Sequence, residues 1–403
     1  MTACTRISVP VRFRPGRHGR LLPVVLLLAT AFPVLALAQE KPEGADATAY
    51  FGEIGAAQAD LDAGRISAAT DRLQATDKTL RGFEFEYLNA RRQAATGEGQ
   101  PAPDLIRVIP RPDVEDRYGV MNEVNGQLVR ICRDGSLRIT ELTDPEVPAK
   151  VLEHPQKSAV WAAVFSRDGK SFFAGHENGE VRIWDATRWE LKQTVAVGTN
   201  WPVREIAAAP DGTAFVAECQ KELELWSLAE KEPKKVAGIG ERFNFGEGLA
   251  FSPKGDLVAT GGMFDINLHD AKTGELTRSM RHASYTMGLE FSPDGKRIAS
   301  APRGNVNRFL AVFEVDGDRP LFNAGLFANY VAGMAFSPDG KRIAATGCEK
   351  MVRIFDAATG AIILTLPRPE CGAKPAFSRD GRFLGWSEPD GYRVIDLGKK
   401  PGE

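Results

Sequence analysis

The chain has 403 residues, with 51 basic and 53 acidic side chains and a formal net charge of −2. Five arginines and no acid occur before residue 21, so the part that follows residue 38 keeps 46 basic (51 less 5) and 53 acidic residues, a balance of −7. This balance argues against nucleic acid or an anionic lipid surface as the main partner, because both require a basic face. The later cysteines form no C-x-x-C pair, which excludes the usual zinc, redox and haem-attachment spacings.

The N-terminal segment has the order of a secretory signal peptide. The arginine-rich residues 1–20 precede an apolar run, Leu21–Leu37, and the sequence Ala36-Leu37-Ala38 supplies small residues at a cleavage site. We therefore expect a signal peptide at residues 1–38, cut after Ala38, and a periplasmic or secreted protein. The alternative is an uncleaved anchor, because the apolar run is close to the length that spans a bilayer. The small residues favour cleavage, after which no membrane insertion is expected.

Residues 39–98 are expected to form a small α-helical domain, because Ala, Leu, Gln, Glu and Arg dominate there without strand signals. Four positions resemble one tetratricopeptide unit, two helices joined by a turn: Ala57, Gly64, Ala69 and Leu73. A third helix is expected from about Lys78 to Ala95, with one face formed by Leu80, Phe83, Tyr87 and Leu88. This face either packs on the other helices or forms a peptide groove, and packing is favoured because stable arrays need about three repeats. A linker rich in Gly and Pro follows at residues 99–104.

A five-residue phrase close to Phe-Ser-Pro-Asp-Gly returns through the rest of the chain. Its copies lie at Phe165–Gly169, Ala209–Gly212, Phe251–Gly255, Phe291–Gly295, Phe336–Gly340 and Phe377–Gly381, with a fainter first copy ending at Gly126. The closing glycines are 43, 43, 43, 40, 45 and 41 residues apart. Short strands repeated at this period predict a β-propeller, with a hairpin at each Asp-Gly.

A second landmark follows each glycine and is clearest at Trp184-Asp185. Its equivalents are Thr140-Glu141, Trp226-Ser227, His269-Asp270, Phe313-Glu314, Phe355-Asp356 and Ile395-Asp396. The pattern resembles the WD40 family, whose third strand in each blade ends in Trp-Asp. The phrase LRGFEFEYL (Leu80–Leu88) resembles the one that closes the helical region of many exported bacterial WD40-repeat proteins. The resemblance implies an all-β, seven-bladed WD40-type propeller at residues 105–398, preceded by the small α-helical domain.

Closure of the ring is expected to use the start of the propeller. The last repeat ends with a third strand at Gly391–Asp396, and too few residues follow to make a fourth. The apolar stretch Leu105–Ile109 has no partner in the first repeat. We expect residues 105–110 to supply the outer strand of the last blade, because an open seam would expose two sheet edges.

Aromatic residues just ahead of the inner strands are the first candidates for binding. They occupy nearly equivalent sequence positions in successive repeats: Trp161, Trp201, Phe245, Tyr285 and Tyr330, with Tyr118 as a possible sixth. Arg204, Arg242 and Arg281 lie nearby in the sequence. Large aromatics are enriched at binding hot spots, and the resemblance to WD40 proteins implies a protein or peptide partner at this face. The alternative is that these aromatics fill the gaps between blades.

The fifth repeat carries the one irregular loop, expected at Ala301–Arg308, with Arg303 and Arg308 in it. Such a loop either binds a partner or is tolerated passively. Cys348 and Cys371 are expected in loops on one face of the ring. They form either a disulfide or two free thiols, because connectivity cannot be deduced from sequence.

The alternative to a scaffold is a propeller enzyme of the hydrolase or lactonase kind, or a small-ligand binder, acting through the central channel. Four histidines follow the signal peptide, and there is no G-x-S-x-G, no H-E-x-x-H and no phosphate-binding glycine loop. The recurring aspartates are explained by the hairpins. We therefore expect a non-catalytic scaffold without metal or cofactor, either a monomer or part of a larger complex.

Overall fold

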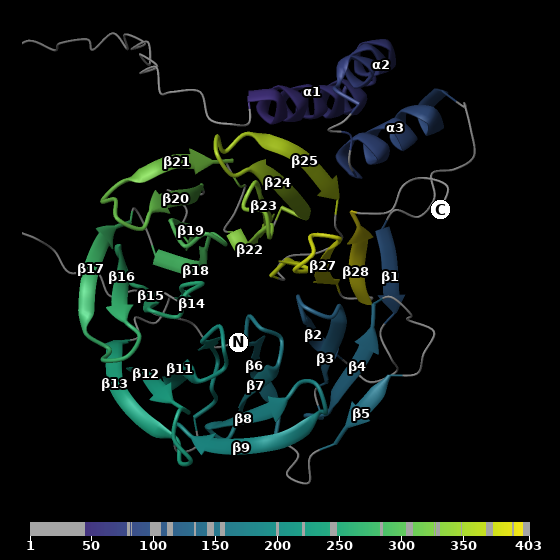
Figure 1. Ribbon diagram of the computed structural model, residues 1–403. Helices are drawn as coiled ribbons and strands as arrows, with labels where there is room; N and C mark the ends of the chain where they lie inside the picture. The colour runs from purple at the N-terminus through teal and green to yellow at the C-terminus, as the bar shows by residue number, and fades with distance from the viewer. Residues whose placement is uncertain are drawn as a thin grey trace, which may run out of the picture. The chain divides into compact units, whose positions relative to one another are not determined.

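The computed structural model describes residues 45–397. Gaps in this description fall at 79–80, 82, 97–105, 111–115, 133, 143–148, 154–157, 199–200, 220–221, 242–247, 283–284, 304–308, 326, 328–330, 348, 368–373 and 389–390. Within the described residues, three helices precede seven four-stranded antiparallel sheets, arranged around a common axis (Figure 1). The expected fold, a seven-bladed β-propeller preceded by a small helical region, is confirmed.

The blades follow one another along the chain, each with its first strand innermost. Blade one contains β2 (Asp116–Met121), β3 (Gln127–Cys132), β4 (Leu137–Glu141) and β5 (Lys150–Leu152). Blade two contains β6 (Val160–Phe165), β7 (Ser171–His176), β8 (Glu180–Asp185) and β9 (Glu190–Ala196). Blade three contains β10 (Ile206–Ala208), β11 (Ala214–Cys219), β12 (Glu222–Ser227) and β13 (Lys234–Glu241). Blade four contains β14 (Leu249–Phe251), β15 (Leu257–Gly261), β16 (Asp265–Asp270) and β17 (Leu276–Arg281).

The last three blades complete the ring. Blade five contains β18 (Tyr285–Phe291), β19 (Arg297–Arg303), β20 (Leu310–Glu314) and β21 (Pro320–Ala324). Blade six contains β22 (Val331–Phe336), β23 (Arg342–Gly347), β24 (Met351–Asp356) and β25 (Ile362–Pro367). Blade seven contains β26 (Ala376–Phe377), β27 (Phe383–Glu388), β28 (Gly391–Asp396) and, from the start of the propeller, β1 (Ile106–Pro110). β1 runs antiparallel to β28, with Ile106 opposite Ile395 and Pro110 opposite Gly391.

The repeated phrase forms the hairpin between the first two strands of a blade. In blade two, the Ser166 hydroxyl donates to Asp168 Oδ1 at 2.6 Å, and the same oxygen accepts the Lys170 amide at 3.0 Å. Gly169 has φ +72°, a conformation that favours glycine. The same Ser–Asp bond recurs in blades five, six and seven. These aspartates therefore close turns, as the sequence suggested.

The phenylalanine that opens five of the copies packs between neighbouring blades. Phe165 is buried with Ile131 and Ile139 of blade one, and Phe291 with Leu268 of blade four. Each sheet therefore covers its faces only against its neighbours, which is why the ring must be complete.

Of the helices α1 (Ala45–Asp62), α2 (Ile66–Ala75) and α3 (Phe83–Thr96), α1 and α3 pack against blade six, and α2 packs against the other two helices (Figure 1). Gly64, with φ +72°, lies in the turn between α1 and α2. α3 begins at Phe83, later than the expected start at about Lys78. The Arg81 side chain caps α2, because its guanidinium donates to the carbonyl groups of Leu73 and Thr76.

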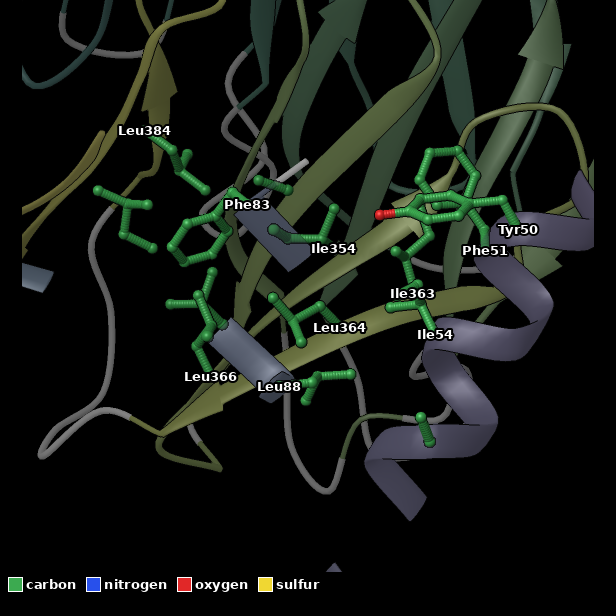
Figure 2. Packing of buried hydrophobic residues seen from close by; sticks show 14 of the residues in the cluster. Tyr50, Phe51, Ile54, Phe83, Leu88, Ile354, Ile363, Leu364, Leu366 and Leu384 are labelled. Atoms are coloured by element: carbon green, nitrogen blue, oxygen red, sulfur yellow. The ribbon is translucent and has the colours of Figure 1, made fainter. Parts of the chain in front are cut away.

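The docking surface of the helices is apolar and continuous with the core of blade six. Figure 2 shows Phe51 and Ile54 of α1 beside Ile363 of β25, and Leu88 of α3 near Leu364. A buried carboxylate, Glu84, forms an ion pair of 2.8 Å with Arg342 of β23. The apolar face of the helices thus contacts the chain's own outer strand.

Residues 1–38, for which we expect a signal peptide, lie outside the described residues. Among the helices that the structure does describe, none has the length and apolar character needed to cross a bilayer.

Candidate functional site

A cavity of about 640 Å³ lies on the axis of the propeller. Its lining comes from the inner strand of every blade, β2, β6, β10, β14, β18, β22 and β26. The cavity has two ends. The inner strands begin at one, here called the strand-start mouth, and the hairpins lie at the other.

Trp161 reaches the cavity because of a β-bulge. On β6, Val160 pairs with His176 and Ala162 with Gly175, which leaves Trp161 as the extra residue. A bulge of this kind re-aims a side chain out of the sheet pattern. The Trp161 side chain lines the cavity and is 36% exposed. The same irregularity recurs on β2, β18 and β22, so a bulge at the strand start is part of the repeat.

Trp201 and Arg204 lie in the segment that leads into β10, and Arg204 contacts Trp161. The Trp201 side chain is 44% exposed. Its segment lies directly over Gly179 of blade two, where a Cβ would be 3.2 Å from the Trp201 carbonyl oxygen. The Arg204 guanidinium lies over the Trp161 ring, 5.5 Å from its centroid, and is itself exposed. Blade two and the segment that leads into blade three therefore present a tryptophan and a cation together at this mouth.

We expected the aromatic residues to occupy equivalent positions in successive blades. Those that the structure describes occupy different positions relative to their inner strands. Trp161 is the second residue of β6, Trp201 precedes β10 by five residues, and Tyr285 is the first residue of β18. Bulges and unequal loops shift these positions relative to one another. Tyr118 is half-buried and packs against the core between blades one and two, so it forms part of the cavity wall. Phe245 and Tyr330 lie outside the described residues, as does the side chain of Tyr285.

The other candidate residues are placed less centrally or are not described. Arg281 ends β17, an outer strand, and is exposed. The loop expected at Ala301–Arg308 is shorter than predicted, because residues 301–303 belong to β19 and pair with β18. Several predicted site residues fall outside the described residues: Arg242, Arg308, Cys348, Cys371 and the side chain of Arg303.

An ion pair crosses the cavity, and sequence reasoning did not find it. Lys374, just ahead of β26, donates to Glu290 of β18 at 3.0 Å and so links blades seven and five. Gly333 on β22 makes room for it, since a Cβ there would lie 2.5 Å from the Lys374 Cα. The carboxylates of Glu290, Glu123 and Glu205 all raise the pKa of Lys374.

Glu123 occupies the hairpin end of the cavity. It takes the turn position that Arg167 and Arg379 occupy in the two adjacent blades, and its side chain is open to solvent within the cavity. Desolvation by the surrounding protein, with the negative charge of Glu290, raises the pKa of Glu123 to about 7. The positive charges of Lys374, Arg167 and Arg379 oppose this shift only in part. Aligning the repeats on their hairpins would have identified this position from sequence.

The described residues contain no group of three or more His, Cys, Asp or Glu side chains arranged to hold a metal ion. The three described histidines are buried and hydrogen-bonded: His176 to the Ser158 carbonyl, His269 to Thr260, and His282 to Ser300. The chemistry available at the strand-start mouth is therefore stacking on tryptophan and recognition by charge.

Two segments of the chain match a family model described as WD domain, G-beta repeat (WD40), at residues 146–185 and 326–356. The chain is similar to serine-threonine kinase receptor-associated protein from Gallus gallus, with 28% identity over 170 residues, 42% of this chain and 47% of that protein. It is also similar to nuclear distribution protein PAC1 from Arthroderma otae, with 23% identity over 168 residues, 39% of this chain and 36% of that protein. The chain thus spans less than half the length of these curated relatives.

A solved structure gives a wider match. The β-propeller domain of Cps50 (Swd1) from Myceliophteria thermophila aligns with a TM-score of 0.59 at 16% identity, over 73% of this chain and all of that domain. At this identity the likeness is one of fold.

Proposed function

We propose that this chain is a non-catalytic scaffold of the WD40 type that binds a protein or peptide at the strand-start mouth. The observation that carries the proposal is the partly exposed Trp161 ring in the wall of a cavity of about 640 Å³, with the Arg204 guanidinium over that ring. The similarity to WD-repeat proteins supports the same kind of role.

The physical argument is that an exposed tryptophan keeps a large apolar surface in contact with water, which is unfavourable unless a partner covers it. A tryptophan offers a large rigid surface with a single polar tip, and such residues dominate binding hot spots. Trp161 is directed outward by a bulge that costs β6 one regular pair with β7. If its only task were to fill the gap between blades, its ring would be covered rather than 36% exposed.

We propose further that the chain is exported to the bacterial periplasm after cleavage behind Ala38. The arginine-rich start, the apolar run and the small residues at 36–38 support this. Sequencing the N terminus of the protein isolated from a periplasmic fraction tests it. A mature chain that begins at Gln39 is the expected result, and a chain that keeps residues 1–38 in the membrane fraction would contradict it.

Site-specific photocrosslinking tests the binding face. A photoreactive residue replaces Trp201 in one variant and Leu276 in another, since Leu276 on the outer strand β17 is also exposed but lies away from the cavity. We expect the label at 201 to capture a defined partner and Trp161→Ala to abolish that capture. Equal capture from both positions, or capture that Trp161→Ala leaves intact, would contradict the proposal. A small molecule retained in the channel without any protein partner would favour the ligand-binding alternative.

A further inference from the structure

We infer that the partner presents a carboxylate, from an acidic side chain or a peptide C terminus, to the Arg204 guanidinium at the strand-start mouth. This inference rests on the proposed function and adds the chemistry that the partner must carry.

Arg204 is a cation without a counter-charge among the described residues. Its one specific contact there is the Trp161 ring, 5.5 Å from the guanidinium carbon, and the residue is exposed. Stacking on an aromatic face covers one side of a guanidinium and leaves its N–H edges free to donate. Those edges match a carboxylate, which accepts two parallel hydrogen bonds.

The nearest acid in sequence does not neutralise Arg204. Successive side chains of an extended segment point in opposite directions, and Glu205 accordingly faces blade four, where its Oε1 accepts the Leu249 amide at 3.0 Å. The charge of Glu205 also acts on Lys374, whose ammonium is bonded to Glu290. Glu205 and Glu290 thus both have hydrogen-bond partners other than Arg204.

Arg204 and Arg281 differ in their position on the propeller. Arg281 ends an outer strand, whereas Arg204 lines the cavity next to Trp161. A bound peptide that stacks on Trp161 would therefore have Arg204 within reach of a carboxylate and would exclude water from one side of that contact. Hydrogen bonds between ionised partners are stronger in such a setting.

The test begins with a random peptide library, displayed with free C termini and selected on the full chain. We expect enriched peptides to carry Asp or Glu, or to depend on their terminal carboxylate. Fluorescence anisotropy then compares a selected peptide with its Asp→Asn or Glu→Gln version and with its C-terminal amide. Loss of the essential carboxylate is expected to weaken binding by about 10- to 100-fold. The arm that loses affinity identifies the source of the carboxylate.

Variants of the protein test the same contact by changing the arginine in place of the carboxylate. Arg204→Glu should weaken the same peptide by about as much and should now select basic peptides, whereas Arg281→Glu, the matched control, should leave affinity unchanged. Thermal melts check that both variants fold. If Trp161→Ala abolishes binding while Arg204→Glu and removal of the carboxylate change nothing, the carboxylate inference fails and the proposed function stands. If the chain shows no saturable peptide binding, both fail.

Discussion

Replacing Gln58 with alanine tests how firmly the helices are attached to the propeller. The Gln58 Nε2 donates to the Thr365 carbonyl oxygen at 2.6 Å, and the Thr365 amide donates to Gln58 Oε1 at 2.7 Å. Thr365 lies on β25, which has a strand partner only on its other edge. The side-chain amide thus supplies the two bonds that a neighbouring strand would supply.

The magnitude follows from these two bonds. Gln58 is 7% exposed, so little water can replace its amide once the side chain is truncated. A buried hydrogen bond contributes about 1 kcal/mol net, and a partner left unsatisfied costs about 1–3 kcal/mol. With two backbone groups affected and some relaxation of α1, Gln58→Ala should lower the free energy of unfolding by about 2–3 kcal/mol.

Urea denaturation and hydrogen exchange at the Thr365 amide measure this effect. Gln74→Ala is the matched control, because Gln74 is exposed on α2, the helix that packs on the other helices. We expect the control to unfold like the wild type and to keep the Thr365 amide protected. If Gln58→Ala shows the same unfolding free energy and the same protection as this control, the helices are not held by that edge and the reasoning is refuted.

Two further predictions concern the cavity wall and a helix glycine. Folding raises the pKa of Glu123 from 4.5 to about 7, so between these pH values the folded state binds more protons than the unfolded state. The free energy of unfolding of the wild type, compared with that of Glu123→Gln, should therefore fall as the pH rises and level off above pH 7. Parallel urea-midpoint curves for the two proteins between about pH 4 and pH 8 would contradict this. Gly333→Ala should destabilise the fold by about 1–3 kcal/mol, because its Cβ would meet the Lys374 backbone at 2.5 Å. Gly52→Ala, in α1 with nothing within 4 Å of the new Cβ, should instead stabilise by about 1 kcal/mol, and thermal melts showing the same sign for both would overturn the comparison.

Most of the architecture could be predicted because the signals for it are local. The glycine of each hairpin adopts the positive φ that its turn needs, as Gly169 and Gly340 do, and the strands on either side are mostly buried, as β22 and β23 are. The fourth strand missing at the C terminus and the spare apolar strand at 106–110 indicated how the ring closes. Boundaries were less accurate where a side chain redirected the backbone, as Arg81 does ahead of α3.

The candidate site could be predicted only in part. Trp161 and Arg204 were identified from residue type and from their place ahead of an inner strand, and the structure brings them into contact. Their position at the same end of the cavity depends on the β-bulge at Trp161. A bulge follows from strand pairing, so no local sequence pattern predicts it. The positions of Glu290 and Lys374, 84 residues apart, depend on the order of the blades around the axis.

The sequence by itself therefore determined the repeat, the number of blades and the turn chemistry, because each of these is set within one blade by residues a few positions apart. Only the tertiary structure decided that the helices cover the edge of blade six, that a tryptophan and an arginine meet at one mouth, and that an ion pair crosses the cavity. These features join residues that are far apart in the sequence. Such residues meet only when the ring closes, so no repeating sequence pattern indicates that they are in contact.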